Sequence, residues 1–235
     1  MHVFYHPLLD IHQAELTEEE SRHAVRVLRM KNGDRLLVTD GKGKMYKAEI
    51  ADADAKHCSL SILEETVVSP PPAVHIHLAV GATKNMDRME WLIEKATEIG
   101  LASFIPLECD HSERTVIKKE RLEKVAIAAM KQSQRNILPD ILPLTSFETC
   151  LKSFAHSEIR KCIAHCAPGE KTLLTQSIRK GEHAVVFIGP EGDFSEHEIK
   201  AALEAGFKAV SLGESRLRTE TAALFALSCI HVLNM

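Results

Sequence analysis

The 235-residue sequence has no long hydrophobic run and no pattern of a secretory leader. No stretch approaches the ~20 apolar residues that cross a bilayer. The first residues also lack the basic flank and the long apolar segment of a signal peptide. These absences argue against a membrane-spanning or a secreted protein, and we expect a cytoplasmic protein with no membrane contact.

Paired cysteines are missing too. The six cysteines, at positions 58, 109, 150, 162, 166 and 229, show no CxxC spacing. In a reducing compartment such residues are free and mostly buried thiols. Cys162, His165 and Cys166 form the tightest group, but zinc requires further ligands at a suitable spacing. We therefore expect no metal site.

The sequence also has no net positive charge and no fingerprint of a nucleotide-binding loop. The formal net charge is −4, and neither a Gly-Lys-Ser/Thr phosphate loop nor a GxGxxG motif is present. These absences disfavour a kinase and a nucleotide-dependent oxidoreductase. The charge is unevenly distributed, however, because eight basic residues stand against two acidic ones from Arg22 to Lys47. Local patches rather than totals set the affinity for phosphate.

Residues 1–70 predict a small β-rich domain with one helix. Thr17–Glu20 fits the Ser/Thr-x-x-Glu capping box, which satisfies free amides at a helix start. The helix is expected to reach about Met30 and to stop at Asn32-Gly33. Residues 35–39 and 45–50 flank a Gly-rich turn and predict a hairpin, and a strand at 57–63 would complete a small barrel or curled sheet.

Three arginines of the predicted helix are candidates for contact with RNA. Arg22, Arg26 and Arg29 are spaced i, i+4 and i+7, so we expect them to share one face, with Lys31 just beyond. The alternative is a solvated helix on which Glu18 pairs with Arg22. Spacing alone favours the alternative, whereas the surrounding basic excess, together with the family resemblance described below, favours RNA.

A proline-rich segment at 66–73 separates this domain from the rest of the chain. Its three consecutive prolines enter neither a sheet interior nor a helix, so we expect a stiff linker. Over residues 74–235 the apolar runs alternate with helical patterns, which is typical of a mostly parallel sheet covered on both faces. The expected strands are 74–80, 101–107, 160–165, 183–188 and 207–212, and the expected helices are 86–99, 120–136, 147–154, 172–179, 195–206 and 219–233.

The last of these helices is apolar on most of its circumference, which indicates burial in the domain or in a subunit interface. The helix at 195–206 begins with a second capping box, Ser195–Glu198, and ends at Gly206.

Two loops of this α/β domain follow strands directly. Gly189–Gly192 follows the strand at 183–188, and Gly213–Thr219 follows the strand at 207–212. Because ligands of open α/β sheets bind at the carboxyl ends of strands, the two loops predict one composite pocket. The alternatives are an ordinary turn for the first loop and a plain N-cap for Thr219.

Both loops carry sequences that resemble a known family. GPEG at 189–192, with LG at 212–213 and LRTETA at 217–222, is similar to the SPOUT-class RNA methyltransferases. The resemblance is strongest to the RsmE-type branch, which methylates N3 of a uridine in 16S ribosomal RNA. Further matches are Arg22–Arg29, Lys84 with Glu90, Lys95–Gly100, and Gln132-Ser133 with Arg135. The sequence departs from the family at Asp193, where glycine is usual, and at Glu214–Arg216.

The resemblance implies a PUA-like β-barrel for 1–70 and a methyltransferase domain with a deep trefoil knot for 74–235. It implies a homodimer, S-adenosylmethionine as the methyl donor, and the small ribosomal subunit as partner. An inactive ribosomal RNA-binding or assembly factor of the same fold is the alternative. By this resemblance the donor contacts His165, Ala167, Gly189, Pro190, Glu191, Gly192, Leu212, Gly213, Leu217, Thr219, Thr221 and Ala222.

Two residues of the second loop are candidates for catalysis. The uridine nitrogen must lose its proton, or its anion must be stabilised, before methyl transfer. Arg218 can donate two parallel hydrogen bonds to that anion. Glu220 either accepts the proton or fixes Arg218 and the loop.

Overall fold

The computed structural model describes residues 1–66 and 74–235. The chain divides into two compact units, Met1–Pro71 with Ile127–Leu138, and Pro72–Ala126 with Pro139–Met235. The predicted linker, 66–73, lies outside the described residues except for Thr66, which ends a strand. The predicted domains, 1–70 and 74–235, stay a prediction, and residues 127–138 group with the first unit by their contacts.

The first unit is built on a four-stranded sheet with the order β1-β2-β3-β4. Its strands are β1 (Val3–Tyr5), β2 (Arg35–Thr39), β3 (Met45–Asp52) and β4 (Ser59–Thr66). β1 is parallel to β2, and β2, β3 and β4 are antiparallel. The predicted hairpin is confirmed, and an isolated bridge between Glu15 and Ser59 extends the sheet beyond β4. Buried Phe4, Leu16, Leu36 and Ile50 fill its core.

The predicted helix of this unit is wrong in length and in register. Only α1 (Glu18–Arg22) is α-helical, and a π-helical turn, η1 (His23–Val27), follows it. The wider turn shows in the bond from Leu28 N to His23 O at 3.0 Å, and Arg29 then takes a left-handed φ of 58°. The three arginines are all exposed. They do not form one regular i, i+4, i+7 row, because the π turn shifts Arg26 and Arg29 lies beyond the helix.

The capping box at Thr17 is half formed. The Thr17 hydroxyl accepts from Glu20 N at 3.3 Å, as predicted. The Glu20 carboxylate is buried and turns elsewhere, since it accepts from Tyr5 N at 3.3 Å and from Lys131 Nζ at 2.6 Å. Glu20 thus links the helix to β1 and to the segment at 127–138.

That segment belongs to the first unit through backbone bonds to the β2–β3 turn. Gly43 N donates to Asn136 O at 2.9 Å, and Asn136 Nδ2 donates back to Gly43 O at 2.6 Å. Leu138 N donates to Gly41 O at 2.8 Å. These bonds join residues more than 90 positions apart, which a periodicity argument cannot detect.

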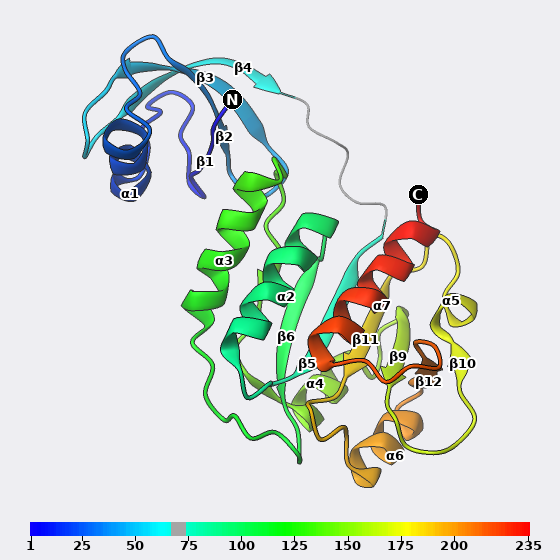
Figure 1. Ribbon diagram of the computed structural model, residues 1–235. Helices are drawn as coiled ribbons and strands as arrows, with labels where there is room; N and C mark the ends of the chain where they lie inside the picture. The colour runs from blue at the N-terminus through cyan, green and yellow to red at the C-terminus, as the bar shows by residue number, and fades with distance from the viewer. Residues whose placement is uncertain (67–73) are drawn as a thin grey trace. The chain divides into compact units, whose positions relative to one another are not determined.

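The second unit contains an eight-stranded sheet whose recorded pairings are all parallel, which confirms the predicted α/β class. The order is β10-β12-β9-β11-β5-β6-β7, and β8 pairs with β6 (Figure 1). The strands are β5 (Ile76–Gly81), β6 (Ser103–Glu108), β7 (Asp140–Ile141), β8 (Thr145–Ser146), β9 (Arg160–Ala164), β10 (Thr172–Leu173), β11 (Ala184–Ile188) and β12 (Lys208–Ser211).

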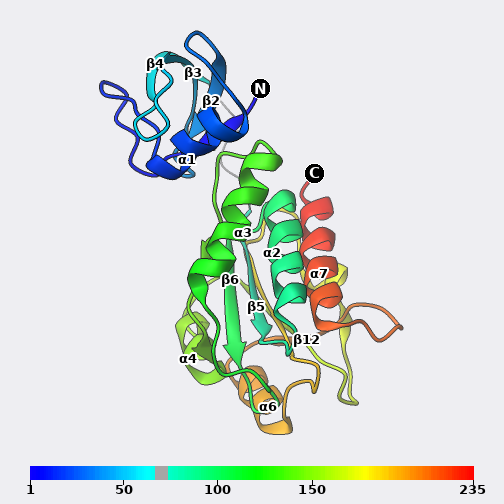
Figure 2. The same cartoon turned by 60° about the vertical axis from the view of Figure 1, so that its left-hand side comes forward.

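Helices cover both faces of this sheet. α2 (Met86–Ile99) and α7 (Thr219–Leu233) lie side by side on one face, and α4 (Phe147–Phe154) and α6 (Glu196–Glu204) lie on the other (Figures 1 and 2). α3 (Lys119–Gln132) completes the long helices. No described helix is long and apolar enough to cross a bilayer.

The local signals that begin and end these helices hold in most places. Gly100 ends α2 with φ 111°, and both bonds of the Ser195–Glu198 capping box are present. The helix predicted at 172–179 is wrong, because residues 172 and 173 pair with β12 and leave only the short α5 (Leu174–Ser177). α7 begins at Thr219, as predicted. The knot that the resemblance implies stays a prediction.

Candidate functional site

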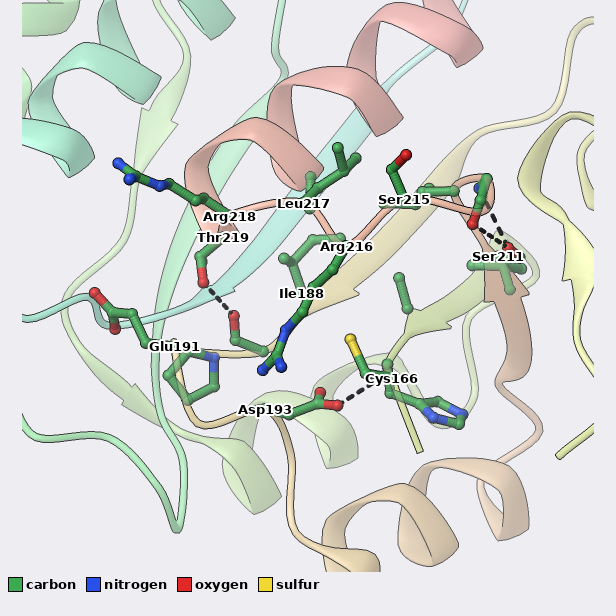
Figure 3. A pocket seen from close by; sticks show the side chains of 18 of the residues that line it. Cys166, Ile188, Glu191, Asp193, Ser211, Ser215, Arg216, Leu217, Arg218 and Thr219 are labelled. Carbon is green, nitrogen blue, oxygen red and sulfur yellow. Dashed lines mark hydrogen bonds between the residues drawn. The ribbon is translucent and has the colours of Figure 1, made fainter. Parts of the chain in front are cut away.

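A cavity of about 580 Å³ lies at the carboxyl ends of β9, β11 and β12. This volume lies within the range of small-molecule sites. Figure 3 shows the two predicted loops on opposite sides of it. Its lining consists of Arg88, Ala164, His165, Cys166, Lys171, Ile188, Gly189, Pro190, Glu191, Asp193, Val210, Ser211, Leu212, Gly213, Glu214, Ser215, Arg216, Leu217, Arg218, Thr219 and Ala222.

A buried hydrogen bond joins the two loops. The Thr219 hydroxyl donates to Gly189 O at 3.0 Å (Figure 3). Arg218, not Thr219, occupies the N-cap position of α7, and Thr219 is the first helical residue. The reading of Thr219 as a plain N-cap is therefore wrong, because its hydroxyl satisfies the neighbouring loop rather than its own helix.

The first loop also lies against the end of β5. A Cβ placed on Gly81 would stand 2.3 Å from Pro190 N, so only glycine lets the two backbones approach this closely. Glu191 adds a second tie, since its carboxylate accepts from Lys84 N at 3.2 Å. The loops after β5 and β11 are thus held together by the close approach of their backbones and by the Glu191 side chain.

Most of the residues predicted to hold a cofactor line this cavity. Four of the residues predicted to bind the cofactor or to act in catalysis do not line it: Ala167, Gly192, Thr221 and Glu220. Ala167 packs against the core beneath α4 and α6, and Thr221 is exposed. Gly192 faces His111, whose Cβ would lie 2.9 Å from a Cβ at position 192.

Glu220 is buried and faces α2. Its side chain is 9% exposed, and its Oε1 lies 3.7 Å from the Nε of Arg88. Arg88 lines the cavity from α2, although sequence reasoning did not select it. The reason is distance along the chain, because Arg88 is more than 120 residues from the second loop and only packing of α2 against α7 brings them together.

The His165 ring has free hydrogen-bonding capacity for a ligand. Both of its ring nitrogens are buried without a described partner, although the residue lines the cavity. Burial lowers the pKa of His165, the Lys171 charge lowers it further, and Asp193 opposes this effect. The neutral ring has one donor and one acceptor, and unpaired polar atoms of this kind are costly unless something binds them. A nucleoside, with its hydroxyls and ring nitrogens, fits this donor and acceptor pair.

The charged groups around the cavity come from both loops. Asp193 has a left-handed φ of 65°, and its carboxylate accepts from Cys166 N at 2.6 Å and from Phe194 N at 2.8 Å. Arg216 is exposed and directs its guanidinium into the cavity, toward the Asp193 carboxylate (Figure 3). The sequence flagged both positions only as departures from the family pattern.

No group of described residues could hold a metal ion. All six cysteines are free, and four of them are buried. Burial raises the pKa of Cys58 to about 11 and the pKa values of Cys150 and Cys162 to about 12. These thiols are inert. Cys166 is the exposed cysteine, and it lines the cavity.

The four residues predicted to contact RNA lie in the first unit. Arg22, Arg26, Arg29 and Lys31 are all exposed. Arg22 pairs with Glu18 at 2.6 Å, which is the contact that the solvated-helix alternative predicts. Exposed pairs of this kind contribute little to stability, so Arg22 can exchange Glu18 for a phosphate.

The comparisons with known proteins agree across the chain. Residues 70–231 match a family model described as an RNA methyltransferase domain, and residues 16–63 match an RNA methyltransferase PUA domain. Ribosomal RNA small subunit methyltransferase E of Bacillus subtilis (strain 168) is 31% identical over 228 residues, covering 92% of this chain and 88% of the relative.

Solved structures agree as well. A probable rRNA-methyltransferase from Porphyromonas gingivalis is 41% identical, with a TM-score of 0.91 over 100% of this chain and 98% of that one. Ribosomal RNA small subunit methyltransferase E from Neisseria gonorrhoeae, solved bound to S-adenosyl methionine, is 32% identical, with a TM-score of 0.87 over 100% and 98%. The chain belongs to the RNA methyltransferase family that includes ribosomal RNA small subunit methyltransferase E.

Proposed function

We propose that the protein transfers a methyl group from S-adenosylmethionine to N3 of a uridine in 16S ribosomal RNA. The observation that carries this proposal is the cavity between the two loops, lined by a His165 ring whose nitrogens have no partner among the described residues. The Neisseria gonorrhoeae relative, which carries S-adenosyl methionine, supports the donor. The curated relatives act on small-subunit ribosomal RNA by their names, which supports the acceptor.

The chemistry asks the protein for alignment and for control of one proton. The bond between the methyl carbon and the donor sulfur breaks as a bond to N3 forms, and S-adenosylhomocysteine is left. The sulfonium supplies the driving force, so the protein's contribution is position and electrostatics. The N3 proton passes to solvent water before the methyl group is transferred, and the negative charge of the resulting anion is shared by the two flanking carbonyl oxygens of the base.

Arg218 is our candidate for stabilising that charge. It stands at the N-cap of α7 and at the edge of the cavity, and it is exposed, so a second substrate can reach it. Its guanidinium stays protonated and can donate two parallel hydrogen bonds. The helix N-terminus adds positive potential at the same place.

For Glu220 the packing favours an anchoring role over proton transfer. Its carboxylate faces Arg88 at 3.7 Å and is almost fully covered. A charged pair of this kind holds the first turn of α7 against α2. Arg218, as the neighbour of that turn, is then held in place. If a Glu220→Gln variant keeps full methylation activity, Glu220 acts as an anchor. If the variant instead loses the pH dependence of methylation, Glu220 acts as the base.

The exposed basic residues of the first unit are our candidate surface for ribosomal RNA. The excess of basic residues from Arg22 to Lys47 lies within a chain that is acidic overall. Phosphate contacts of this kind supply affinity and position rather than sequence selectivity. We place the protein in the cytoplasm, where small ribosomal subunits are found.

We also propose that the protein acts as a homodimer through α2 and α7. Large apolar side chains are exposed on these two adjacent helices: Trp91 at 43%, Phe225 at 45% and Val232 at 66%. Large exposed apolar side chains on adjacent helices are typical of interfaces. Sedimentation equilibrium should give twice the chain mass, and Phe225→Glu should shift it to one chain mass.

The decisive experiment is methylation of unmodified small subunits or 16S ribosomal RNA, followed by mass spectrometry of the nucleosides. We expect one 3-methyluridine per RNA molecule with S-adenosylmethionine present, and none without it. Binding of RNA with no methyl transfer would instead support the inactive assembly factor. Comparing free RNA with assembled subunits in the same assay identifies the preferred substrate.

A further inference from the structure

We infer that Asp193 and Arg216 read the amino-acid end of the bound methyl donor. The Asp193 carboxylate receives the α-ammonium group, and the Arg216 guanidinium receives the α-carboxylate. This inference rests on the proposed function of the cavity. It adds which residues distinguish S-adenosylmethionine from other adenosine compounds.

The Asp193 carboxylate is held in place and has acceptor sites left for a ligand. Backbone amides of Cys166 and Phe194 each donate to one of its oxygens, at 2.6 and 2.8 Å. A carboxylate has about four acceptor sites, so two remain for a ligand. Asp193 is half-buried beside Gly189, where a Cβ would stand 3.0 Å from Asp193 Oδ1, and the first loop therefore presents the carboxylate at close range.

Arg216 supplies the opposite charge from the second loop. Its guanidinium points across the cavity toward Asp193 (Figure 3). Within the described part of the chain, it forms no ion pair with a carboxylate, and Asp193 is not within ion-pair distance of it. The two charges thus face each other with space between them. A zwitterion, with ammonium and carboxylate on one carbon, complements such an arrangement.

Three other charged groups at the cavity have partners within the described chain. Lys171 Nζ donates to Ala167 O, Arg88 pairs with Glu220, and Glu191 accepts from Lys84 N. Arg218 stands at the start of α7, where we place the uridine. His165 and the apolar Ile188, Leu212 and Leu217 suit the uncharged nucleoside instead. Glu214 also lines the cavity and is exposed. We choose Asp193 for the ammonium because two backbone amides hold its carboxylate in place, and Arg216 for the carboxylate because it points across the cavity toward Asp193.

The test compares three ligands by calorimetric titration. S-adenosylhomocysteine has both charged groups, its decarboxylated form keeps only the ammonium, and 5′-methylthioadenosine has neither. Arg216→Gln and Asp193→Asn remove one charge each. Lys200→Gln and Glu196→Gln are matched controls, because both residues are exposed on α6 and outside the cavity. Asparagine tolerates the left-handed φ of position 193. Its amide nitrogen cannot accept a hydrogen bond from one of the two backbone N–H groups that the carboxylate holds, so 5′-methylthioadenosine reports any change in the loop itself.

The expected pattern is specific to each charge. Arg216→Gln should weaken the binding of S-adenosylhomocysteine about tenfold and leave the binding of its decarboxylated form unchanged. Asp193→Asn should weaken both of these ligands about tenfold and leave 5′-methylthioadenosine unchanged. Because each comparison is made within one variant, a general distortion of the loop would lower all three affinities together. That result, or no change at all, overturns the inference.

The proposed function fails in a different way. If the unaltered protein binds none of the three ligands, the cavity does not hold the methyl donor, and the proposed function falls with the inference. If it binds S-adenosylhomocysteine but the variants do not discriminate among the ligands, only the roles of Asp193 and Arg216 fall.

Discussion

The hydroxyl of Thr219 donates to the carbonyl oxygen of Gly189 at 3.0 Å, and this buried bond joins residues of two loops that are 30 positions apart in the sequence. This bond joins the start of α7 to the end of β11. Both loops line the cavity, so the bond sets the separation of its two sides. Because Arg218 directly precedes Thr219, the same bond holds the proposed catalytic arginine against the cofactor loop.

Thr219→Val should therefore destabilise the protein and weaken its binding of the methyl donor. The variant keeps the shape of the side chain but leaves a buried carbonyl oxygen unsatisfied, which costs about 1–3 kcal/mol. Urea titration should show this loss, and calorimetry should show weaker binding of S-adenosylmethionine. Thr221→Val is the control for stability, since Thr221 is exposed on the same turn. Equal stability of the two variants would show that the bond contributes nothing.

Gly81→Ala should disturb the cofactor loop from the side of β5. The added Cβ would lie 2.3 Å from Pro190 N, a backbone atom that cannot turn away. Overpacking of this kind costs about 1–3 kcal/mol. We expect a lower midpoint in urea and weaker donor binding. In Gly169→Ala the added Cβ meets open space at a φ of 135°, so this comparison isolates backbone strain from the clash. A larger loss in Gly169→Ala than in Gly81→Ala would contradict the close approach.

Arg218→Ala should separate chemistry from donor binding. Loss of one donor to a developing oxyanion lowers turnover by roughly a hundred- to a thousand-fold. The Kd of S-adenosylmethionine should change little, because the cofactor loops keep their contacts. Single-turnover methylation and calorimetry measure the two effects. Lys200→Ala, on α6, controls for the change in charge. Near-normal turnover in Arg218→Ala would remove the arginine from the mechanism.

Reversing the charges of Arg22 and Arg26 together should weaken the binding of ribosomal RNA and make that binding depend less on salt concentration. Each lost phosphate contact lowers the salt slope by roughly 1, so the double variant should lose roughly 2. Filter binding across a range of salt concentrations measures the slope. The matched control reverses Lys152 and Lys200, which are exposed on α4 and α6. A slope that does not change would exclude this surface.

His77 should make stability depend on pH. Burial lowers its pKa from the ordinary value of 6.5, the charges of His75 and His183 lower it further, and Asp140 opposes them. The folded state therefore binds fewer protons than the unfolded state just below pH 6.5. The His77 contribution is complete above pH 6.5 and is lost as the pH falls toward the lowered pKa. Urea titrations above and below pH 6.5 measure how much of the free energy of unfolding is lost as the pH falls. This loss should be smaller in His77→Gln than in the unaltered protein, and identical losses would rule His77 out.

Local sequence was sufficient for much of the second unit. α4 and α7 begin and end where their patterns predict, and Gly100 and Ser195 mark helix ends through their own backbone and side-chain bonds. Such signals act within one turn of the chain. The prediction failed at 172–179, where pairing with β12 overrode helical preference, and after Arg22, where a π turn shifted the register.

The amino-acid order alone determined the alternation of strands and helices, the two loops after β11 and β12, and the residue types that those loops bring. The tertiary structure alone decided that Thr219 bonds Gly189, that Arg88 meets Glu220, and that Arg216 faces Asp193. The physical reason is the strand order β12-β9-β11, which sets loops from distant parts of the chain beside one another. The periodicity of the sequence predicts which face of a helix or strand a residue lies on. Only the packing of the elements decides which residue it contacts.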